Sequence, residues 1–168
     1  MINFTKKQIK AIIDILKSEP CKTRPALQTM RIRRDGYGYI TNGYLAIRFK
    51  FSLEPVPKDE KQEEFIIPLD NLVKWYKSAD ARKTLNELEI LGLQDTENDT
   101  QYPNVEWLFE KRLSGEVPKT DIKVNSKLLS NILNITNKES LIQIHHYHEC
   151  IHVMFPDDNI DAILMEIN

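Results

Sequence analysis

Two glycine turns lie close together in the segment 24–51 and constrain the fold more than any other feature of the chain. Asp35-Gly36 and Asn42-Gly43 separate three stretches rich in strand-forming residues, ALQTMRIRR, GYGYIT and YLAIRFKF. Both dipeptides are strong signals for a tight hairpin, and glycine adopts the positive φ that a type I′ turn requires. We therefore expect three consecutive antiparallel strands.

Apolar residues at helical spacing predict three helices. The first lies in TKKQIKAIIDILKS, opens with a capping box of Thr5 and Gln8, and ends before Pro20. The second extends from about residue 69 to 82, and the third is SKLLSNILNIT.

Predicted strands surround these helices in a repeating order. FIIPL precedes the second helix and LNELEILGL follows it, DIKVN precedes the third, and ESLIQIHHY, ECIHVMF and IDAILMEIN come last. The order is strand, helix and three strands, then strand, helix and one strand, then strand, helix and three strands. One such unit is too small to bury its own apolar faces. The pattern predicts an α+β fold of βαβββ repeats with helices in one layer and antiparallel sheets in the other.

Composition divides the chain at one connector. Residues 54–63 combine two prolines with charge and show no periodicity, which is typical of an exposed linker. We expect a first domain over 1–112, built from units 1–53 and 64–112. A third half-unit over 113–168 is expected to pack on it.

Overall composition excludes several classes of protein. With 168 residues, 41% hydrophobic and 29% charged, the chain is typical of globular proteins. No apolar run approaches the roughly 20 residues of a membrane helix, and the N-terminus lacks the apolar core of a signal peptide. We expect a cytoplasmic protein with no membrane contact. Cys21 and Cys150 lack the spacing of a zinc ribbon, and we expect both to be reduced and buried.

Four short motifs carry a family resemblance. After the first helix comes Arg-Pro-Ala-Leu at 24–27, followed by Thr-Asn-Gly-Tyr-Leu-Ala at 41–46. Further on are Tyr-Pro-Asn-Val at 102–105 and Leu-Met-Glu-Ile-Asn at 164–168. In this order they resemble motifs of the sliding clamp of bacterial replicative DNA polymerases, the DNA polymerase III beta subunit. The length suggests a shortened relative, from a compact genome such as that of a phage or mobile element.

The resemblance implies a non-enzymatic processivity factor of DNA replication that needs no cofactor. Clamps of this family capture short linear peptides of DNA polymerases and clamp loaders in an apolar pocket. Read from the residues alone, Leu164, Met165 and Ile167 could instead complete a core strand. The residues implied for peptide binding are Thr41, Gly43, Tyr44, Leu45, Pro103, Leu108, Leu164, Met165 and Ile167.

The family also encircles double-stranded DNA through basic helix faces, which for so short a chain requires a homo-oligomer. Lysines on a helix neutralise phosphates without reading sequence, but lysine is also the common residue of a solvated helix face. The residues implied for DNA binding are Lys7, Lys10, Lys17, Lys74, Lys77 and Arg82.

Two alternative functions stay open. One is a decoy that occupies the partners of a host clamp without forming a ring. The other is a small metal-dependent enzyme, because histidines two apart on a strand share a face and can bind zinc. We expect neither a metal site nor catalysis, since the chain has no P-loop and no paired carboxylates of catalytic type. The cluster concerned comprises His145, His146, His148, Cys150 and His152.

Overall fold

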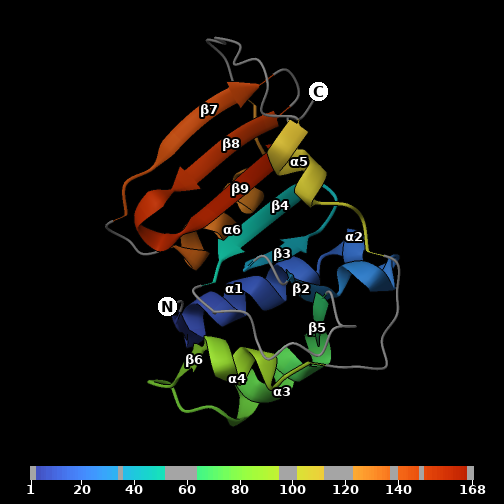
Figure 1. The fold of residues 1–168 in the computed structure, drawn as a ribbon, viewed down its shortest axis with the longest axis vertical. Helices are drawn as coiled ribbons and strands as arrows, with labels where there is room; N and C mark the ends of the chain where they lie inside the picture. Colours follow the sequence, from blue (N-terminus) through green and yellow to red (C-terminus); the bar gives the residue numbers. More distant parts are fainter. Residues whose placement is uncertain are drawn as a thin grey trace.

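A seven-stranded antiparallel sheet forms the frame of the protein (Figure 1). The computed structural model describes residues 3–33, 36–51, 64–94, 102–111, 123–136, 140–147 and 150–165. The strand order is β5-β2-β3-β4-β9-β8-β7, and a separate two-stranded sheet pairs β1 with β6. The strands are β1 Asn3–Thr5, β2 Thr29–Arg33, β3 Tyr37–Thr41, β4 Leu45–Lys50, β5 Glu64–Pro68, β6 Thr84–Asn86, β7 Gln143–Tyr147, β8 Cys150–Phe155 and β9 Ile160–Met165.

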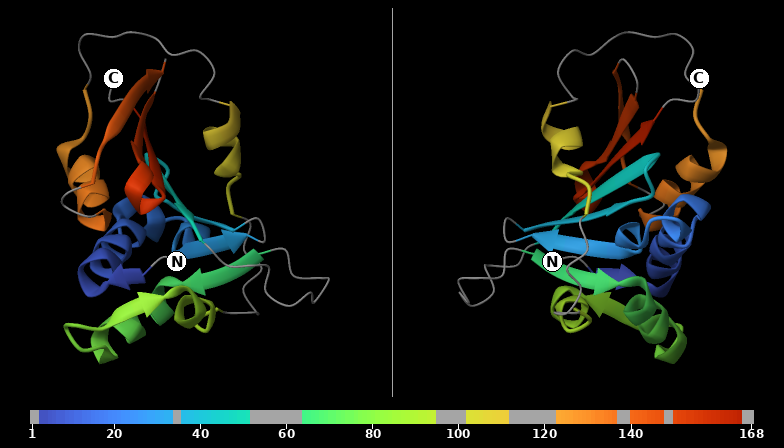
Figure 2. Two further views of the ribbon diagram at one scale, coloured as in Figure 1. Left: turned by 60° about the vertical axis from the view of Figure 1, so that its left-hand side comes forward. Right: turned by 90° about the vertical axis from the view of Figure 1, so that its right-hand side faces the viewer.

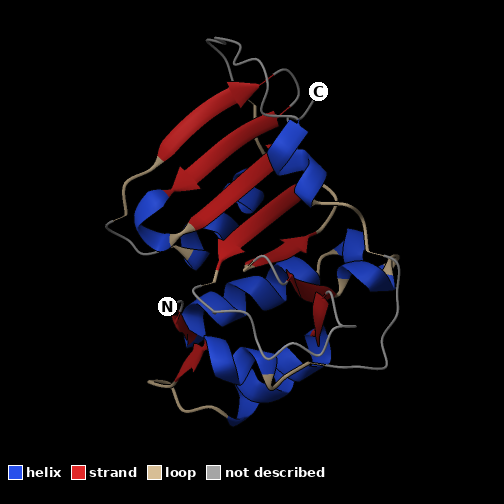
Figure 3. Ribbon diagram, in the orientation of Figure 1, coloured by secondary structure: helices blue, strands red, loops and turns tan. Residues whose placement is uncertain are grey.

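Helices cover both faces of this sheet unequally. Figure 2 shows α1 and α6 on one face and the short α5 on the other, and Figure 3 separates the layers by colour. Helix α1 packs against both α3 and α6. This arrangement confirms the predicted α+β fold with helices packed against antiparallel sheets. The α-helices are α1 Lys6–Leu16, α2 Glu19–Lys22, α3 Leu69–Ser78, α4 Glu87–Leu91, α5 Glu106–Lys111 and α6 Ser126–Ile135, with 3-10 turns at Pro25–Leu27 and Pro156–Asp158.

Helix α1 forms because an N-terminal capping box and a continuous apolar face both favour a helix in this segment. The Thr5 side chain accepts a hydrogen bond from the Gln8 backbone, and the Gln8 side chain accepts from the Thr5 backbone, which is the predicted capping box. Ile9, Ile12 and Ile15 are fully buried between the sheet and the neighbouring helices. In the described ranges no helix is both long and apolar enough to cross a bilayer.

Strand pairing joins distant parts of the chain. Strand β4 lies between β3 and β9, with Leu45 opposite Leu164 and Phe49 opposite Ile160. The first and third predicted units therefore share one sheet, and β5 of the second unit extends it beside β2. The domain division at residue 112 remains a prediction.

The predicted strand LNELEILGL is wrong over most of its length. Only Thr84–Asn86 is extended, and Glu87–Leu91 forms α4. Asn86 Oδ1 accepts a hydrogen bond from the Glu89 backbone, and the Glu89 carboxylate accepts from the Asn86 backbone. This reciprocal cap starts a helix and outweighs the alternating apolar pattern.

Three other expectations differ in extent. The predicted helix 69–82 ends at Ser78, and Glu106–Lys111, a stretch with no predicted helix or strand, forms α5. Residues 123–125, the described part of DIKVN, form no strand, while 121–122 lie outside the described residues.

We predict that Gly38→Ala destabilises the fold. A Cβ at Gly38 would lie 2.3 Å from Cε2 of the Phe51 ring, which is itself buried in the core. Overpacking of this kind costs about 1–3 kcal/mol in the free energy of unfolding, measured by urea denaturation. The cost should shrink in a Phe51→Leu background, because the two sites touch. Additive costs in the double variant would contradict this explanation.

Candidate functional site

The 41–46 motif builds a tight turn between β3 and β4. Asn42 Oδ1 accepts hydrogen bonds from the backbones of Tyr44 (3.0 Å) and Leu45 (2.9 Å). Thr41 Oγ1 accepts from the Gly43 backbone at 3.1 Å. Gly43 has a φ of 91°, whereas Tyr44 has a negative φ. Positive φ at the first central residue alone is the pattern of a type II′ turn, so the expected type I′ geometry is wrong here.

The turn presents one large side chain to solvent. Asn42 and Thr41 are 3% and 4% exposed, whereas Tyr44 is 59% exposed. The Met165 backbone at the end of β9 donates a hydrogen bond to the Tyr44 carbonyl at 2.9 Å. This bond holds Tyr44 and Met165 side by side.

A groove of about 860 Å³ opens beside Tyr44 and Met165. It lies between the C-terminal end of α1, the start of α2, the turn, and the first turns of α6. Its volume falls within the range of ligand pockets. The lining residues are Asp14, Lys17, Ser18, Glu19, Pro20, Asn42, Tyr44, Asn125, Lys127, Leu128, Asn131 and Met165.

The structure brings only some of the residues implied for peptide binding to this groove. Tyr44 and Met165 line it, and Thr41 and Gly43 shape the turn. Leu45 and Leu164, each 1% exposed, pair across β4 and β9 and belong to the core.

Pro103 and Leu108, the two residues implied from the segment 102–111, do not line this groove. Leu108 packs on the cluster that α5 covers, and exposed Pro103 lines a separate pocket of about 280 Å³ beside Arg31 and Tyr102. Ile167 lies outside the described residues.

Sequence reasoning missed most of the groove wall. Pro20 was identified only as a helix stop, and Leu128 and Asn131 had no assigned role. These residues come together because α1 packs on α6. The two helices are far apart in the sequence, so local sequence patterns do not predict this contact. Lys17, which the resemblance implied for DNA binding, is one of the residues that line the groove.

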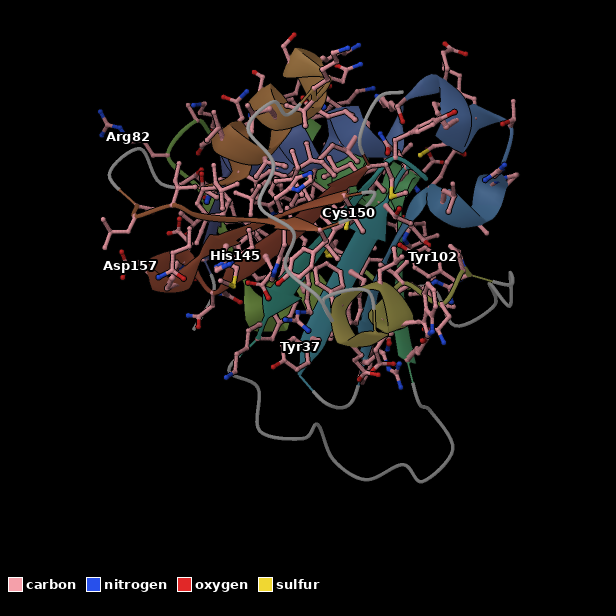
Figure 4. The ribbon with its side chains drawn as sticks, turned by 90° about the horizontal axis from the view of Figure 1, so that it is seen from above. Tyr37, Arg82, Tyr102, His145, Cys150 and Asp157 are labelled. Carbon is pink, nitrogen blue, oxygen red and sulfur yellow. The ribbon has the colours of Figure 1, made fainter. Side chains whose placement is uncertain are left out.

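The basic residues implied for DNA binding are all exposed but lie in different places. Lys7 and Lys10 are on α1, and Lys10 forms an ion pair with Asp14 four residues later. Lys74 and Lys77 are on α3. Arg82 projects from the side of the molecule opposite Tyr102 (Figure 4).

The described members of the histidine cluster lie on the hairpin of β7 and β8. His145 lies opposite His152 with ring centroids 6.5 Å apart, while His146 points to the other face of the sheet. Cys150 is buried, and His148 lies outside the described residues. Over the described ranges no three His, Cys, Asp or Glu side chains gather to hold a metal ion.

Helix α5 is held on the sheet by aromatic and cationic contacts. The Arg48 guanidinium lies 4.6 Å from the Phe109 ring and 4.9 Å from the Tyr37 ring, and it forms an ion pair with Asp161. The Phe109 ring also meets His152 edge-on at 6.2 Å. Figure 4 shows Tyr37 and Tyr102 on the face that α5 covers.

Burial shifts the proton affinity of His152. Its side chain is 4% exposed, and Nε2 has no hydrogen-bond partner in the described part of the chain. Desolvation lowers the pKa of His152, Arg48 and His145 lower it further, and Asp161 opposes the shift.

Solved structures of bacterial beta clamps have the same architecture. The Helicobacter pylori beta clamp bound to a DNA ligase peptide matches with a TM-score of 0.64 and 13% identity, over 99% of this chain and 65% of that one. The chain has a clamp-like fold. The Bacillus subtilis sliding clamp matches with a TM-score of 0.57 and 11% identity, over 99% of this chain and 64% of that one.

The similarity to the beta clamps therefore extends over nearly the whole chain, as the sequence motifs implied. The clamp-like chain spans 65% and 64% of these two clamps. No protein-family model and no curated protein sequence matches it. At such identities the likeness shows the fold alone.

We predict that the clamp-like fold loses stability in mild acid partly through His152. Because its folded pKa lies below its unfolded value of about 6.5, the unfolded chain binds the proton more readily. This contribution is complete above that value and is lost as the pH falls below it. His152→Phe should weaken the decrease in urea midpoint between pH 7.5 and 5.5.

The matched control is Gln143→Thr on the neighbouring strand, an exposed position that carries no titratable group and should keep the wild-type pH dependence. An unchanged pH dependence in His152→Phe would show that other groups account for the acid sensitivity.

Proposed function

We propose that the protein is a cytoplasmic, non-enzymatic clamp-like factor of DNA replication. It binds short linear peptides of DNA polymerase or clamp-loader-type proteins in the groove beside Tyr44. The observation that carries the proposal is the 59% exposed Tyr44, held next to Met165 over a groove of about 860 Å³. A tyrosine at the wall of a groove offers a bound partner both an apolar ring and a polar hydroxyl.

Apolar contact is the source of affinity in this proposal. Tyr44, Leu128, Pro20 and Met165 provide the apolar wall of the groove. An apolar side chain that enters it gains about 25 cal/mol for each Å² of apolar surface removed from water. The Helicobacter pylori clamp, which shares the fold, was solved with a DNA ligase peptide bound. That structure supports peptides as the ligand class.

We predict that Tyr44→Ala weakens peptide binding at least tenfold, or about 1.4 kcal/mol, because the groove loses its largest apolar side chain. Fluorescence anisotropy with labelled synthetic peptides from bacterial polymerases and clamp loaders measures the effect.

Trp107→Ala is the matched control for this test. Trp107 is also exposed, at 41%, but it lies on α5 and does not line the groove. Its loss should leave peptide affinity unchanged. Equal peptide affinities of wild type and Tyr44→Ala would contradict peptide binding in this groove.

A second function, binding of double-stranded DNA, is favoured by the charge of the helix layer. Helix α1 carries Lys6, Lys7 and Lys10 against Asp14, and α3 carries two lysines against one aspartate. Both helices are net positive, although the chain has a net charge of -2. Such a face neutralises phosphates without reading sequence. Encircling DNA would require a homo-oligomer, whereas a decoy of host clamp partners would bind peptides without retention on circular DNA.

We predict that Lys74→Glu weakens DNA binding to the same degree for all sequences and reduces the slope of log affinity against log salt by about 1. Filter binding at several salt concentrations measures both quantities. Lys50→Glu, which changes the net charge equally at an exposed position of β4, is the control. Equal losses in the two variants would assign the effect to net charge and overturn the helix-face proposal.

A further inference from the structure

The charges around the groove are paired unequally. Four charged side chains line it: Asp14, Lys17, Glu19 and Lys127. Both acidic groups have a cation on their own helix. Lys10 Nζ lies 2.6 Å from Asp14 Oδ2, and Lys22 forms an ion pair with Glu19. Neither Lys10 nor Lys22 lines the groove.

The two groove lysines have no such partner. Within the residues that the structure describes, neither Lys17 nor Lys127 forms an ion pair. The four charged side chains that line the groove sum to zero, and with Lys10 and Lys22, the partners of the two acidic groups, the sum is +2. The whole chain has a net charge of -2, which makes this a local excess.

We infer that the groove selects peptides whose apolar anchor is flanked by acidic residues, and that Lys17 and Lys127 determine this preference. The inference rests on the proposed peptide-binding function and names the kind of peptide. Lys17 follows the last turn of α1, and Lys127 lies in the first turn of α6. The two ammonium groups come from different helices at the groove that Tyr44 and Met165 line.

The geometry separates affinity from selectivity. Apolar contacts with Tyr44, Leu128 and Met165 bury the same apolar anchor whatever the charge of the residues that flank it. The exposed lysines add an attraction that depends on the sign of the flanking residues and weakens with salt. A basic flank meets two cations, neither of which forms an ion pair among the described residues. The preference should therefore be largest at low salt and shrink as salt rises.

This role differs from the one that the clamp resemblance implies for Lys17. A lysine that contacts DNA affects DNA affinity and leaves peptide selection unchanged. Lys7, on the same helix, does not line the groove, so the two lysines of α1 can be tested against each other.

The test uses three synthetic peptides with one apolar anchor and flanks of aspartate, serine or lysine. Wild-type protein should bind them in the order Asp, Ser, Lys, with about fivefold or more between the first and last at low salt. The double variant Lys17→Glu, Lys127→Glu should reverse the order. Lys7→Glu is the matched control and should keep the wild-type order. Lys17→Gln with Lys127→Gln, which removes charge without adding it, should abolish the preference.

The outcomes distinguish this inference from the proposed function. Equal affinity for the three peptides, or an unchanged order in the double variant, overturns the acidic preference and leaves the peptide groove intact. Failure of all three peptides to bind wild-type protein overturns the proposed function and the inference together. Thermal denaturation of each variant checks that the fold is retained.

Discussion

The apolar contact between α1 and the sheet is the interaction on which the other elements depend. Ile9, Ile12, Ile15 and Leu16 of this helix have no exposed surface. One side of α1 contacts the sheet, and its flanks contact α3 and α6. The same contact orients the end of the helix, where Asp14 and Lys17 reach the groove. Core packing and the position of the candidate site therefore have one physical origin.

Local signals in the sequence predicted the parts of this arrangement that local interactions determine. The Thr5 and Gln8 cap, the α1 stripe and the hairpin at Gly43 all involve residues close in the chain. The prediction at 87–91 was wrong because two local signals compete there. The Asn86 cap favours a helix, whereas the alternating apolar pattern favours a strand. Alternation alone does not decide such a case.

The candidate site was less predictable for a different reason. The motif resemblance identified Tyr44 and Met165, but it also included Leu45 and Leu164, whose side chains point into the core. Neighbours on a strand alternate between faces, so a motif that lists them together mixes wall and core residues. The wall from α6 depends on long-range helix packing. The ion pair of Lys10 with Asp14 four residues later is a local pattern, whereas the placing of Lys17 and Lys127 at one groove depends on that helix packing.

The central position of β9 has a consequence for biosynthesis. The strand lies between β4 and β8, and Leu164 pairs with Leu45 from the first third of the chain. A ribosome that has synthesised α1 and the first hairpins has made β4 without its second neighbour. Contacts so distant in sequence slow folding, and unpaired strand edges promote aggregation. Until β9 has emerged, β4 lacks the strand that pairs with this edge in the folded protein.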